Sequence, residues 1–480
     1  MRKKTKIICT MGPATDRDGV LDALIAGGMN CARFNFSHGT HEEQAGRIAK
    51  VRAAAKKADA VVPLLLDTKG PEMRLGEFAE GKVELKKGSR FLLTADDAPG
   101  DASRVSVNHK KLYAEVKPGD TLLLSDGLVA LNVEAIEGTD IVTAVLNDGP
   151  MSTRKRVAAP GVALGLPPIS EQDEKDILFG IGQGMDFVAA SFIQRAEDVR
   201  AIRALIAKHG GHMEILSKIE NLEGVKNFDA ILAETDGVMV ARGDLGVEIP
   251  AEDVPLIQKE IIAKCNRAGK PVIVATQMLE SMTANPRPTR AEASDVANAI
   301  LDGTDAIMLS GETASGDYPV EAVETMARIA ERTERALSYR EIIEGAGVER
   351  HKTTEAIAHA TVQLAYEVGA KLIITPTASG YTTRMVSKYR PKAGILAFTP
   401  SEEVARHLNL RWGVETIASA CPWKDEGEMA ALSTAAAKEA GLAREGDRTI
   451  ITSGIKVATG NTNAIRVYTV EKKEKQKGAI

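Results

Sequence analysis

Short apolar runs alternate with segments of helical periodicity through most of the chain. Eight of these runs are rich in Val, Ile and Leu, which is typical of parallel strands covered on both faces: 6–10, 32–36, 61–67, 187–192, 214–220, 237–241, 271–276 and 306–309. Between them lie segments that fit amphipathic helices: 20–26, 42–57, 173–182, 198–209, 254–267, 290–301 and 320–337. This alternation predicts an α/β protein built on a closed (β/α)8 TIM barrel, and an open doubly wound sheet is the structural alternative.

One interval, from 72 to about 157, departs from this rhythm. Its short segments alternate apolar and polar residues and are separated by turn signals such as Pro118-Gly119 and Asp148-Gly149-Pro150: 82–85, 90–94, 121–125, 128–135 and 141–146. We therefore expect a small all-β domain at 72–157, inserted after the third barrel strand. At that position it would lie above the barrel mouth as a lid.

The chain after the barrel has a second α/β pattern. A linker is expected at 342–350, and helices at 355–368, 383–388, 404–408 and 428–440 then alternate with strands at 371–375, 394–398, 448–452 and 464–470. No helix separates the last two strands, so they could pair as an edge hairpin. These patterns predict a barrel domain at 1–71 and 158–340 and an open α/β domain at 341–480.

The composition is that of an ordinary globular protein. Of the 480 residues 44% are hydrophobic and 26% charged, and the formal net charge of −5 is too mild to indicate a nucleic-acid or membrane partner. No apolar stretch is long enough to span a bilayer and no signal peptide is recognisable, so we expect a cytoplasmic protein. Its four cysteines are widely spaced and are expected to be reduced: Cys9, Cys31, Cys265 and Cys421.

Polar side chains at the carboxyl ends of the runs carry the candidate chemistry. After the second run, Arg33, Asn35 and Ser37 share one strand face, while the two intervening Phe residues point away. A guanidinium suits a phosphate, and neutral oxygens suit a hard cation. The alternative is a strand end whose polar side chains are simply solvated.

The third run ends in Asp67 and Thr68, which add a carboxylate and a hydroxyl to the same cation site. Arg74, slightly further along, can reach an anion. The intervening Gly70-Pro71 fits a turn that merely reverses the chain, and Lys69 is more often solvated than catalytic.

The fifth and sixth runs supply a lysine and two carboxylates. Lys218 and Glu220 share a strand face, which fits either a catalytic pair or a structural ion pair. Glu220 and Asp244 together are suited to Mg²⁺, leaving coordination positions for substrate oxygens. Gly243 lets backbone N–H groups approach a ligand carboxylate, and Thr276, after the seventh run, could position a proton.

Several other activities are excluded by missing motifs. There is no GxxxxGK[ST] phosphate loop, and the glycines at 180–184 follow helical sequence rather than a strand, unlike a dinucleotide fingerprint. The eight histidines show no HExxH spacing, which argues against zinc.

These same residues lie in motifs that resemble the pyruvate kinase family. The matching stretches run through the whole barrel: Thr5-Lys-Ile-Ile-Cys-Thr-Met-Gly-Pro13, Asn35-Phe-Ser-His-Gly39, Leu66-Asp-Thr-Lys-Gly-Pro-Glu72, Ser217-Lys-Ile-Glu-Asn221, Met239-Val-Ala-Arg-Gly-Asp-Leu-Gly246, Ala275-Thr-Gln-Met-Leu-Glu-Ser-Met282, Pro286-Arg-Pro-Thr-Arg-Ala-Glu292 and Met308-Leu-Ser-Gly-Glu-Thr-Ala314. Similarity continues more loosely into the last domain.

The resemblance implies phosphoryl transfer from phosphoenolpyruvate to ADP, followed by protonation of enolpyruvate. It implies catalytic roles for Lys218, Arg33 and Thr276, with Gly243 and Asp244 also binding substrate. The implied ligands are Glu220 and Asp244 for Mg²⁺ or Mn²⁺; Asn35, Ser37, Asp67 and Thr68 for K⁺; and Arg74 and Lys155 for the nucleotide phosphates. Family members that do not need K⁺ tend to carry Lys at position 72, so Glu72 indicates a K⁺-dependent enzyme.

Two segments depart from the family pattern. The usual Lys-Gly-Val-Asn-Leu-Pro-Gly is Lys155-Arg-Val-Ala-Ala-Pro-Gly161 here, which weakens the assignment of Lys155. In the last domain, 377–382 resembles a loop that binds a sugar-phosphate activator, through Thr377, Ser379, Gly380 and Thr382. Tyr381 replaces a small residue there, and the loop 453–460 lacks a tryptophan common in fructose-bisphosphate-responsive members. A phosphorylated effector and a homotetramer are expected by resemblance.

Two rival functions stay open at this point. Related barrels that use Lys, Glu and Asp include Mg²⁺-dependent lyases or aldolases acting on pyruvate-like enolates. A non-catalytic sugar-phosphate sensor could also keep the fold, although such a protein would be free to lose Lys218, Glu220 and Asp244.

Overall fold

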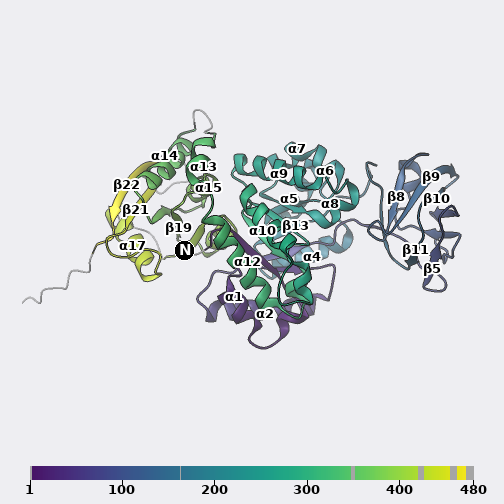
Figure 1. Cartoon of the computed structure of the whole chain (residues 1–480), viewed down its shortest axis with the longest axis horizontal. Helices are drawn as coiled ribbons and strands as arrows, with labels where there is room; N and C mark the ends of the chain where they lie inside the picture. The colour runs from purple at the N-terminus through teal and green to yellow at the C-terminus, as the bar shows by residue number, and fades with distance from the viewer. Residues whose placement is uncertain (1–2, 163, 348–351, 420–425, 455–461, 472–480) are drawn as a thin grey trace, which may run out of the picture.

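The structure is a computed structural model that describes residues 3–162, 164–347, 352–419, 426–454 and 462–471. The barrel occupies the middle of the molecule, with the inserted β domain at one end and the C-terminal domain at the other (Figure 1). Within the described residues, no helix is both long and apolar enough to cross a membrane.

Eight parallel strands close the barrel, as the alternating pattern predicts. Their order around it is β1-β17-β16-β15-β14-β13-β3-β2. The strands are β1 (Lys6–Thr10), β2 (Cys31–Asn35), β3 (Leu64–Asp67), β13 (Phe187–Ala190), β14 (Glu214–Ile219), β15 (Gly237–Ala241), β16 (Val272–Ala275) and β17 (Ala306–Leu309). The expected fold class is confirmed, and the open-sheet alternative is wrong.

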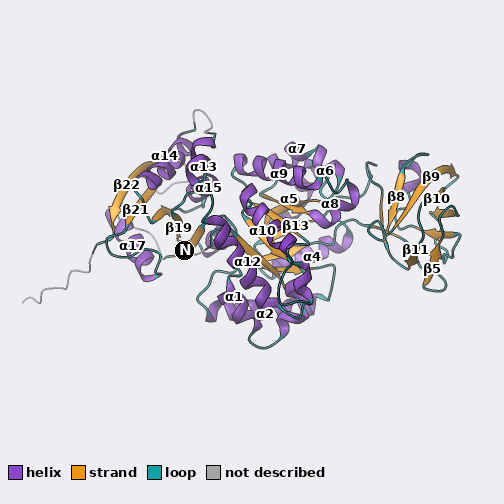
Figure 2. Ribbon diagram, in the orientation of Figure 1, coloured by secondary structure: helices purple, strands orange, loops and turns teal. Residues whose placement is uncertain are grey.

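Helices surround the strands (Figure 2). The main ones are α1 (Val20–Gly27), α2 (His41–Lys57), α4 (Glu171–Gly182), α5 (Ala196–Lys208), α9 (Val254–Ala268), α10 (Arg290–Asp302) and α12 (Pro319–Glu334), with short α6 (Leu222–Lys226), α7 (Phe228–Glu234), α8 (Arg242–Glu248) and α11 (Gly311–Ala314) in the loops. Several begin with a capping box, for example Thr40 with Glu43 at α2 and Ser170 with Asp173 at α4.

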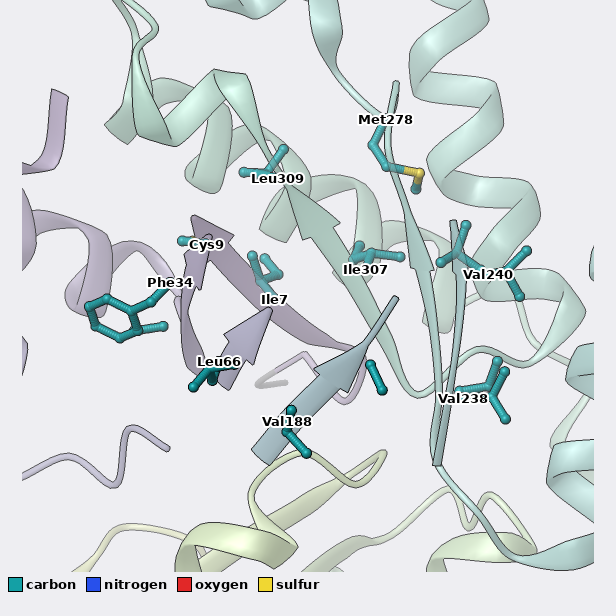
Figure 3. Close-up of a cluster of buried hydrophobic side chains, with 14 of the residues drawn as sticks. Ile7, Cys9, Phe34, Leu66, Val188, Val238, Val240, Met278, Ile307 and Leu309 are labelled. Atoms are coloured by element: carbon teal, nitrogen blue, oxygen red, sulfur yellow. The ribbon is translucent and has the colours of Figure 1, made fainter. Parts of the chain in front are cut away.

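Alternate side chains along each strand divide between two cores. Outward-facing residues such as Phe34, Leu66 and Val188 pack beneath the helices (Figure 3). Inward-facing residues such as Leu65 and Leu216 form a separate cluster inside the barrel. The next inward positions toward the carboxyl end therefore carry the polar side chains of the candidate site.

The insertion is an all-β domain, as expected. A seven-stranded sheet runs β4-β12-β8-β9-β10-β6-β7, and β11 pairs with β5 in a small second sheet. The strands are β4 (Met73–Arg74), β5 (Lys82–Leu85), β6 (Arg90–Thr94), β7 (Arg104–Ser106), β8 (Thr121–Leu124), β9 (Val129–Glu137), β10 (Asp140–Val145), β11 (Gly149–Ser152) and β12 (Arg156–Ala158), with one short helix, α3 (Leu112–Glu115). The pattern missed four short strands, and the turn expected at Asp148-Gly149-Pro150 is wrong because β11 begins at Gly149.

The C-terminal domain is an open sheet of order β20-β19-β18-β21-β22. Its strands are β18 (Leu372–Pro376), β19 (Gly394–Thr399), β20 (Val414–Ala418), β21 (Arg448–Gly454) and β22 (Thr462–Thr469), and its helices are α14 (Thr353–Glu367), α15 (Tyr381–Lys388), α16 (Glu402–Leu408) and α17 (Glu426–Glu439). The edge hairpin is confirmed, since β21 and β22 pair antiparallel. The linker prediction is wrong at its start, because α13 (Tyr339–Gly345) is helical through 345; residues 348–351 lie outside the described part.

This domain docks on the amino-terminal floor of the barrel. Leu410 is fully buried in the cluster that fills the barrel interior. Ion pairs flank it: Arg406 Nε lies 2.7 Å from Asp186 Oδ1, and Arg390 Nη2 lies 2.9 Å from Asp305 Oδ2. The mouth and the floor of the barrel thus face different domains.

Candidate active site

The candidate site lies at the carboxyl ends of the barrel strands, where Lys218 contacts three polar side chains. Its Nζ lies 3.0 Å from Asp67 Oδ1 and 2.9 Å from Glu220 Oε1, and it donates a hydrogen bond of 2.7 Å to Ser191 Oγ. Burial alone would lower the pKa of Lys218, but the carboxylates of Asp67 and Glu220 outweigh it and raise that pKa. Lys218 is therefore a fixed positive charge.

Arg33 reaches the other oxygen of the same aspartate. Its Nε lies 2.6 Å from Asp67 Oδ2, and its Nη1 donates to Thr10 Oγ1 at 2.8 Å. Burial opposes ionisation of Asp67, but Arg33 and Lys218 together lower its pKa. One buried carboxylate thus holds two cations side by side, an arrangement suited to a phosphoryl group.

The four residues expected to bind K⁺ lie on two adjacent strands and the turns that follow them. Asn35 pairs with Asp67 in the β2–β3 ladder, and Asn35 Oδ1 accepts a hydrogen bond from the exposed Ser37 backbone at 3.1 Å. Thr68 Oγ1 accepts from Ser191 N at 3.1 Å. Asp67 Oδ1 is buried and faces Lys218 Nζ at 3.0 Å, so a bound cation would share this oxygen with the lysine.

Glu220 and Asp244 come from neighbouring strand ends. Glu220 is only 1% exposed; its Oε2 accepts from Phe192 N at 2.7 Å, and its Oε1 faces Lys218 Nζ at 2.9 Å. Burial raises the pKa of Glu220 to about 7; Lys218 lowers it in part, and the nearby Asp244 raises it further. Among the described residues no three His, Cys, Asp or Glu side chains converge as a metal cage, so these two carboxylates fit a cation such as Mg²⁺ that takes its remaining ligands from water and substrate.

Asp244 lies in the first turn of α8, where it contacts a residue of the lid. Arg156, on β12, forms an ion pair with Asp244 Oδ1 through Nη1, and its guanidinium lies 4.8 Å from the Phe192 ring centre. The sequence reasoning did not single out Arg156, and the signal that could have found it is its replacement of a glycine in the family hinge motif.

Thr276 has a strained backbone, with φ of 70° in the left-handed region that β-branched residues rarely adopt. Its Oγ1 accepts from Gly243 N at 2.7 Å and donates to Ala275 O at 2.6 Å. Arg242, also missed, donates to Thr276 O at 2.7 Å and pairs with Asp295 at 2.6 Å. These contacts fix the hydroxyl beside the start of α8.

The residues expected to bind nucleotide lie at the lid hinge. Arg74 pairs with Glu72, with Nε to Oε2 at 2.9 Å, and also donates to Arg154 O at 2.9 Å. Lys155 is exposed. The structure thus brings Arg33, Asp67, Lys218 and Glu220 into direct contact and places these two at the rim.

The expected effector loop lies in the C-terminal domain, on the far side of the barrel floor from this site. Gly380, with φ of 77°, precedes α15, and its N–H donates to Thr377 Oγ1 at 2.9 Å. Thr382 Oγ1 lies 2.5 Å from Thr462 Oγ1. Ser379 is part of the same turn, whereas most of the loop 453–460 lies outside the described residues.

Comparisons with known proteins agree along nearly the whole chain. The family model described as pyruvate kinase, barrel domain, matches residues 2–323, and that described as pyruvate kinase, alpha/beta domain, matches residues 355–468. Pyruvate kinase of Geobacillus stearothermophilus is 52% identical over 98% of this chain and 81% of its own, and that of Clostridium acetobutylicum is 50% identical over 98% and 100%. The crystal structure of a pyruvate kinase from Cryptosporidium parvum superposes with a TM-score of 0.94 at 42% identity, covering 98% of this chain and 96% of that one.

Proposed function

The chain belongs to the pyruvate kinase family, and from this premise we propose which of its residues carry out the family's reaction. The enzyme is a phosphotransferase of glycolysis that passes the phosphoryl group of phosphoenolpyruvate to ADP, giving pyruvate and ATP. The lyase or aldolase alternative has no support among its relatives.

Lys218 and Arg33 are proposed to stabilise the phosphoryl group as it moves. The observation that carries this assignment is that both cations are held by the single buried carboxylate of Asp67. Phosphoryl transfer involves little covalent chemistry by the protein and depends on positioning and on cations aimed at the developing charge. Ser191, which accepts from Lys218 Nζ, limits the rotation of that side chain.

Glu220 and Asp244 are proposed to hold Mg²⁺ or Mn²⁺. When bound, the ion supplies a Lewis acid for the carboxylate and enol oxygens of the substrate. The fit rests on two carboxylates from neighbouring strand ends, close enough that Asp244 raises the pKa of Glu220. Gly243, whose N–H faces Thr276 Oγ1, keeps space for the substrate carboxylate beside Asp244.

Asn35, Ser37, Asp67 and Thr68 are proposed to hold K⁺. Support comes from the ladder pairing of Asn35 with Asp67, which brings the two side chains to the same end of neighbouring strands. The proposed K⁺ requirement rests on one residue, Glu72, whose carboxylate pairs with Arg74 and supplies no positive charge of its own.

Thr276 is proposed to position the proton that reaches the enolpyruvate carbon. Its hydroxyl is oriented by Gly243 N and Ala275 O, and its strained φ is stabilised by Arg242. Strain of this kind persists where surrounding contacts hold it, and it concentrates at active sites.

Arg74 is proposed to contact the nucleotide phosphates, with Lys155 in a lesser role. Both are carried by the lid hinge, so lid movement would bring them toward the barrel mouth. A homotetramer, a phosphorylated effector at Thr377–Thr382 and a cytoplasmic location are also proposed. The described cysteines, Cys9, Cys31 and Cys265, are buried and free, as a reducing compartment allows, while Cys421 lies outside the described residues.

The test is an ATP-forming assay with phosphoenolpyruvate and ADP, with Mg²⁺ and K⁺ varied independently. Removal of either cation should reduce turnover, and Lys218→Met should abolish phosphoryl transfer in a protein whose thermal unfolding stays cooperative. Full activity without K⁺ would overturn the proposed monovalent site.

A further inference from the structure

A cavity lies at the floor of the barrel, where the C-terminal domain docks. It has a volume of about 200 Å³, including the part open to solvent, and lies between the end of α9, the segment before β17 and α15. Five of its lining side chains are cationic and one is a carboxylate: Lys270, Arg384, Lys388, Arg390 and Arg411 against Asp305. Because part of this space is open to solvent, an ion can enter it from outside.

Two of these arginines are buried with N–H groups that have no partner. Arg390 is 7% exposed, and its Nη2 donates to Asp305 (2.9 Å), Gly303 O (2.8 Å) and Asn266 (2.7 Å). Its Nε and Nη1 make no hydrogen bond with any described residue. Arg411 is 5% exposed; its Nη1 donates to Gly269 O at 2.8 Å, and its Nε has no partner. Buried guanidinium N–H groups are costly to leave unpaired.

The carboxylates near the cavity compensate this charge only in part. The closest to Arg411 is Glu214, 3.8 Å from Nη2, and it lies equally far from Arg384 Nη1. Lys388 Nζ forms an ion pair with Glu355 Oε2 at 2.7 Å. Burial is the main cause that lowers the pKa of both Arg411 and Lys270, and neighbouring cations lower it further. An anion in the cavity would satisfy both the charge and the free donors.

We propose that this cavity binds a tetrahedral oxyanion, either inorganic phosphate or the phosphoryl group of a phosphate monoester. Planar guanidinium groups present paired donors that match phosphate oxygens. The site is distinct from the barrel mouth, which lies at the opposite end of the barrel strands. It is also distinct from the loop 377–382, which leads into the amino-terminal end of α15. An ion bound here contacts both the barrel floor and α15, so it strengthens the docking of the C-terminal domain on the barrel.

The position is tested by crystallography with an anomalous tetrahedral dianion. Crystals grown without sulfate or phosphate are soaked in selenate. The proposal expects a selenium peak within hydrogen-bonding distance of Arg411 Nε. Waters alone in the cavity, with peaks only at the barrel mouth or the loop 377–382, would overturn it.

The affinity is tested in solution on the full chain by calorimetric titration with inorganic phosphate and, separately, with glycerol 3-phosphate. Arg411→Met should weaken one binding event at least tenfold and leave any others unchanged, and Lys270→Met, the second variant, should act in the same direction. Arg340→Met is the matched control, because Arg340 is exposed, away from the cavity lining, and pairs with Glu344 at 2.7 Å. Tighter binding of the ester would identify a monoester as the ligand, and tighter binding of phosphate the free ion. Equal titrations for wild type, Arg411→Met and Lys270→Met would refute the site.

Discussion

Arg156 on the lid and Asp244 on the barrel form an ion pair that joins the hinge strand β12 to the proposed Mg²⁺ site. The Arg156 side chain is only 10% exposed, lies over the Phe192 ring, and has a second carboxylate, Asp126, at 3.7 Å. Burial alone would lower the pKa of Arg156, but Asp244, Glu220 and other carboxylates raise it, so it stays charged. A guanidinium and a divalent cation therefore compete for the same oxygen of Asp244.

Arg156→Gly, which restores the residue common in the family, should tighten divalent-cation binding. Removal of the competing guanidinium is expected to lower the Kd for Mn²⁺ about three- to tenfold, or about 0.7–1.4 kcal/mol. Electron paramagnetic resonance titration of free Mn²⁺ without substrates measures this directly. Lys155→Gly is the control, since Lys155 is exposed, and it should leave the Kd unchanged. An unchanged or weaker affinity in Arg156→Gly would contradict the competition.

Lys218→Met should separate the two halves of the reaction. Loss of the cation is expected to reduce phosphoryl transfer by about 10³- to 10⁵-fold, the range for removing a positive group that stabilises such a transition state. Proton exchange on pyruvate should survive in part, because Thr276 and the carboxylates stay in place. Exchange of the pyruvate methyl protons with deuterated water, followed by NMR, is compared with ATP formation. Equal loss of both activities would show that Lys218 has a different role.

Thr276→Ala should give the opposite pattern. Without the hydroxyl that Gly243 N and Ala275 O orient, proton exchange is expected to fall by about 10²-fold or more, while phosphoryl transfer falls less. Thr276→Ser, which keeps the hydroxyl, is the matched control and should retain most of the exchange. If Ser and Ala variants behave alike, the methyl group and not the hydroxyl is what matters.

The sequence predicts the barrel strands well because strands covered on both faces are continuous apolar runs. Of the eight, 6–10, 237–241 and 306–309 agree with the structure residue for residue. The pattern fails at β20, whose Glu415 and Thr416 are only partly buried, and at short lid strands such as β11 that contain Gly and Pro. Such strands are held by their neighbours and not by their own composition.

The site is predictable only as far as strand periodicity reaches. The two-residue repeat places Lys218 and Glu220 on one face, and the structure has them 2.9 Å apart. The contact of Lys218 with Ser191 depends on the packing of β14 against β13, and that of Arg156 with Asp244 depends on how the lid sits. Neither contact follows from local spacing, and the sequence singled out neither Ser191 nor Arg156.

Glu72→Lys should relax the K⁺ requirement. A fixed ammonium at this position would supply the positive charge that K⁺ otherwise brings, and it would also release Arg74 from its pair with Glu72. Initial rates measured with tetramethylammonium in place of K⁺ provide the test. Glu72→Gln removes the carboxylate without adding a cation and should still need K⁺. A K⁺ requirement that Glu72→Lys leaves intact would contradict this argument.

Glu220 should make the metal-free protein less stable as the pH rises from about 4 to 7. Its pKa is raised to about 7 in the folded state, chiefly by burial, whereas in the unfolded chain it is near the ordinary value of 4.5. Between these values the unfolded chain has lost the proton and the folded protein retains it, so the free energy of unfolding falls with pH and levels off above 7. The full difference from the ordinary glutamate value of 4.5 corresponds to roughly 3 kcal/mol. Urea unfolding in a chelating buffer at pH 5, 6, 7 and 8 measures it, and Glu220→Gln, which cannot ionise, should lack this component of the slope. Parallel pH curves for the two proteins would mean that Glu220 ionises at its ordinary pKa despite being buried.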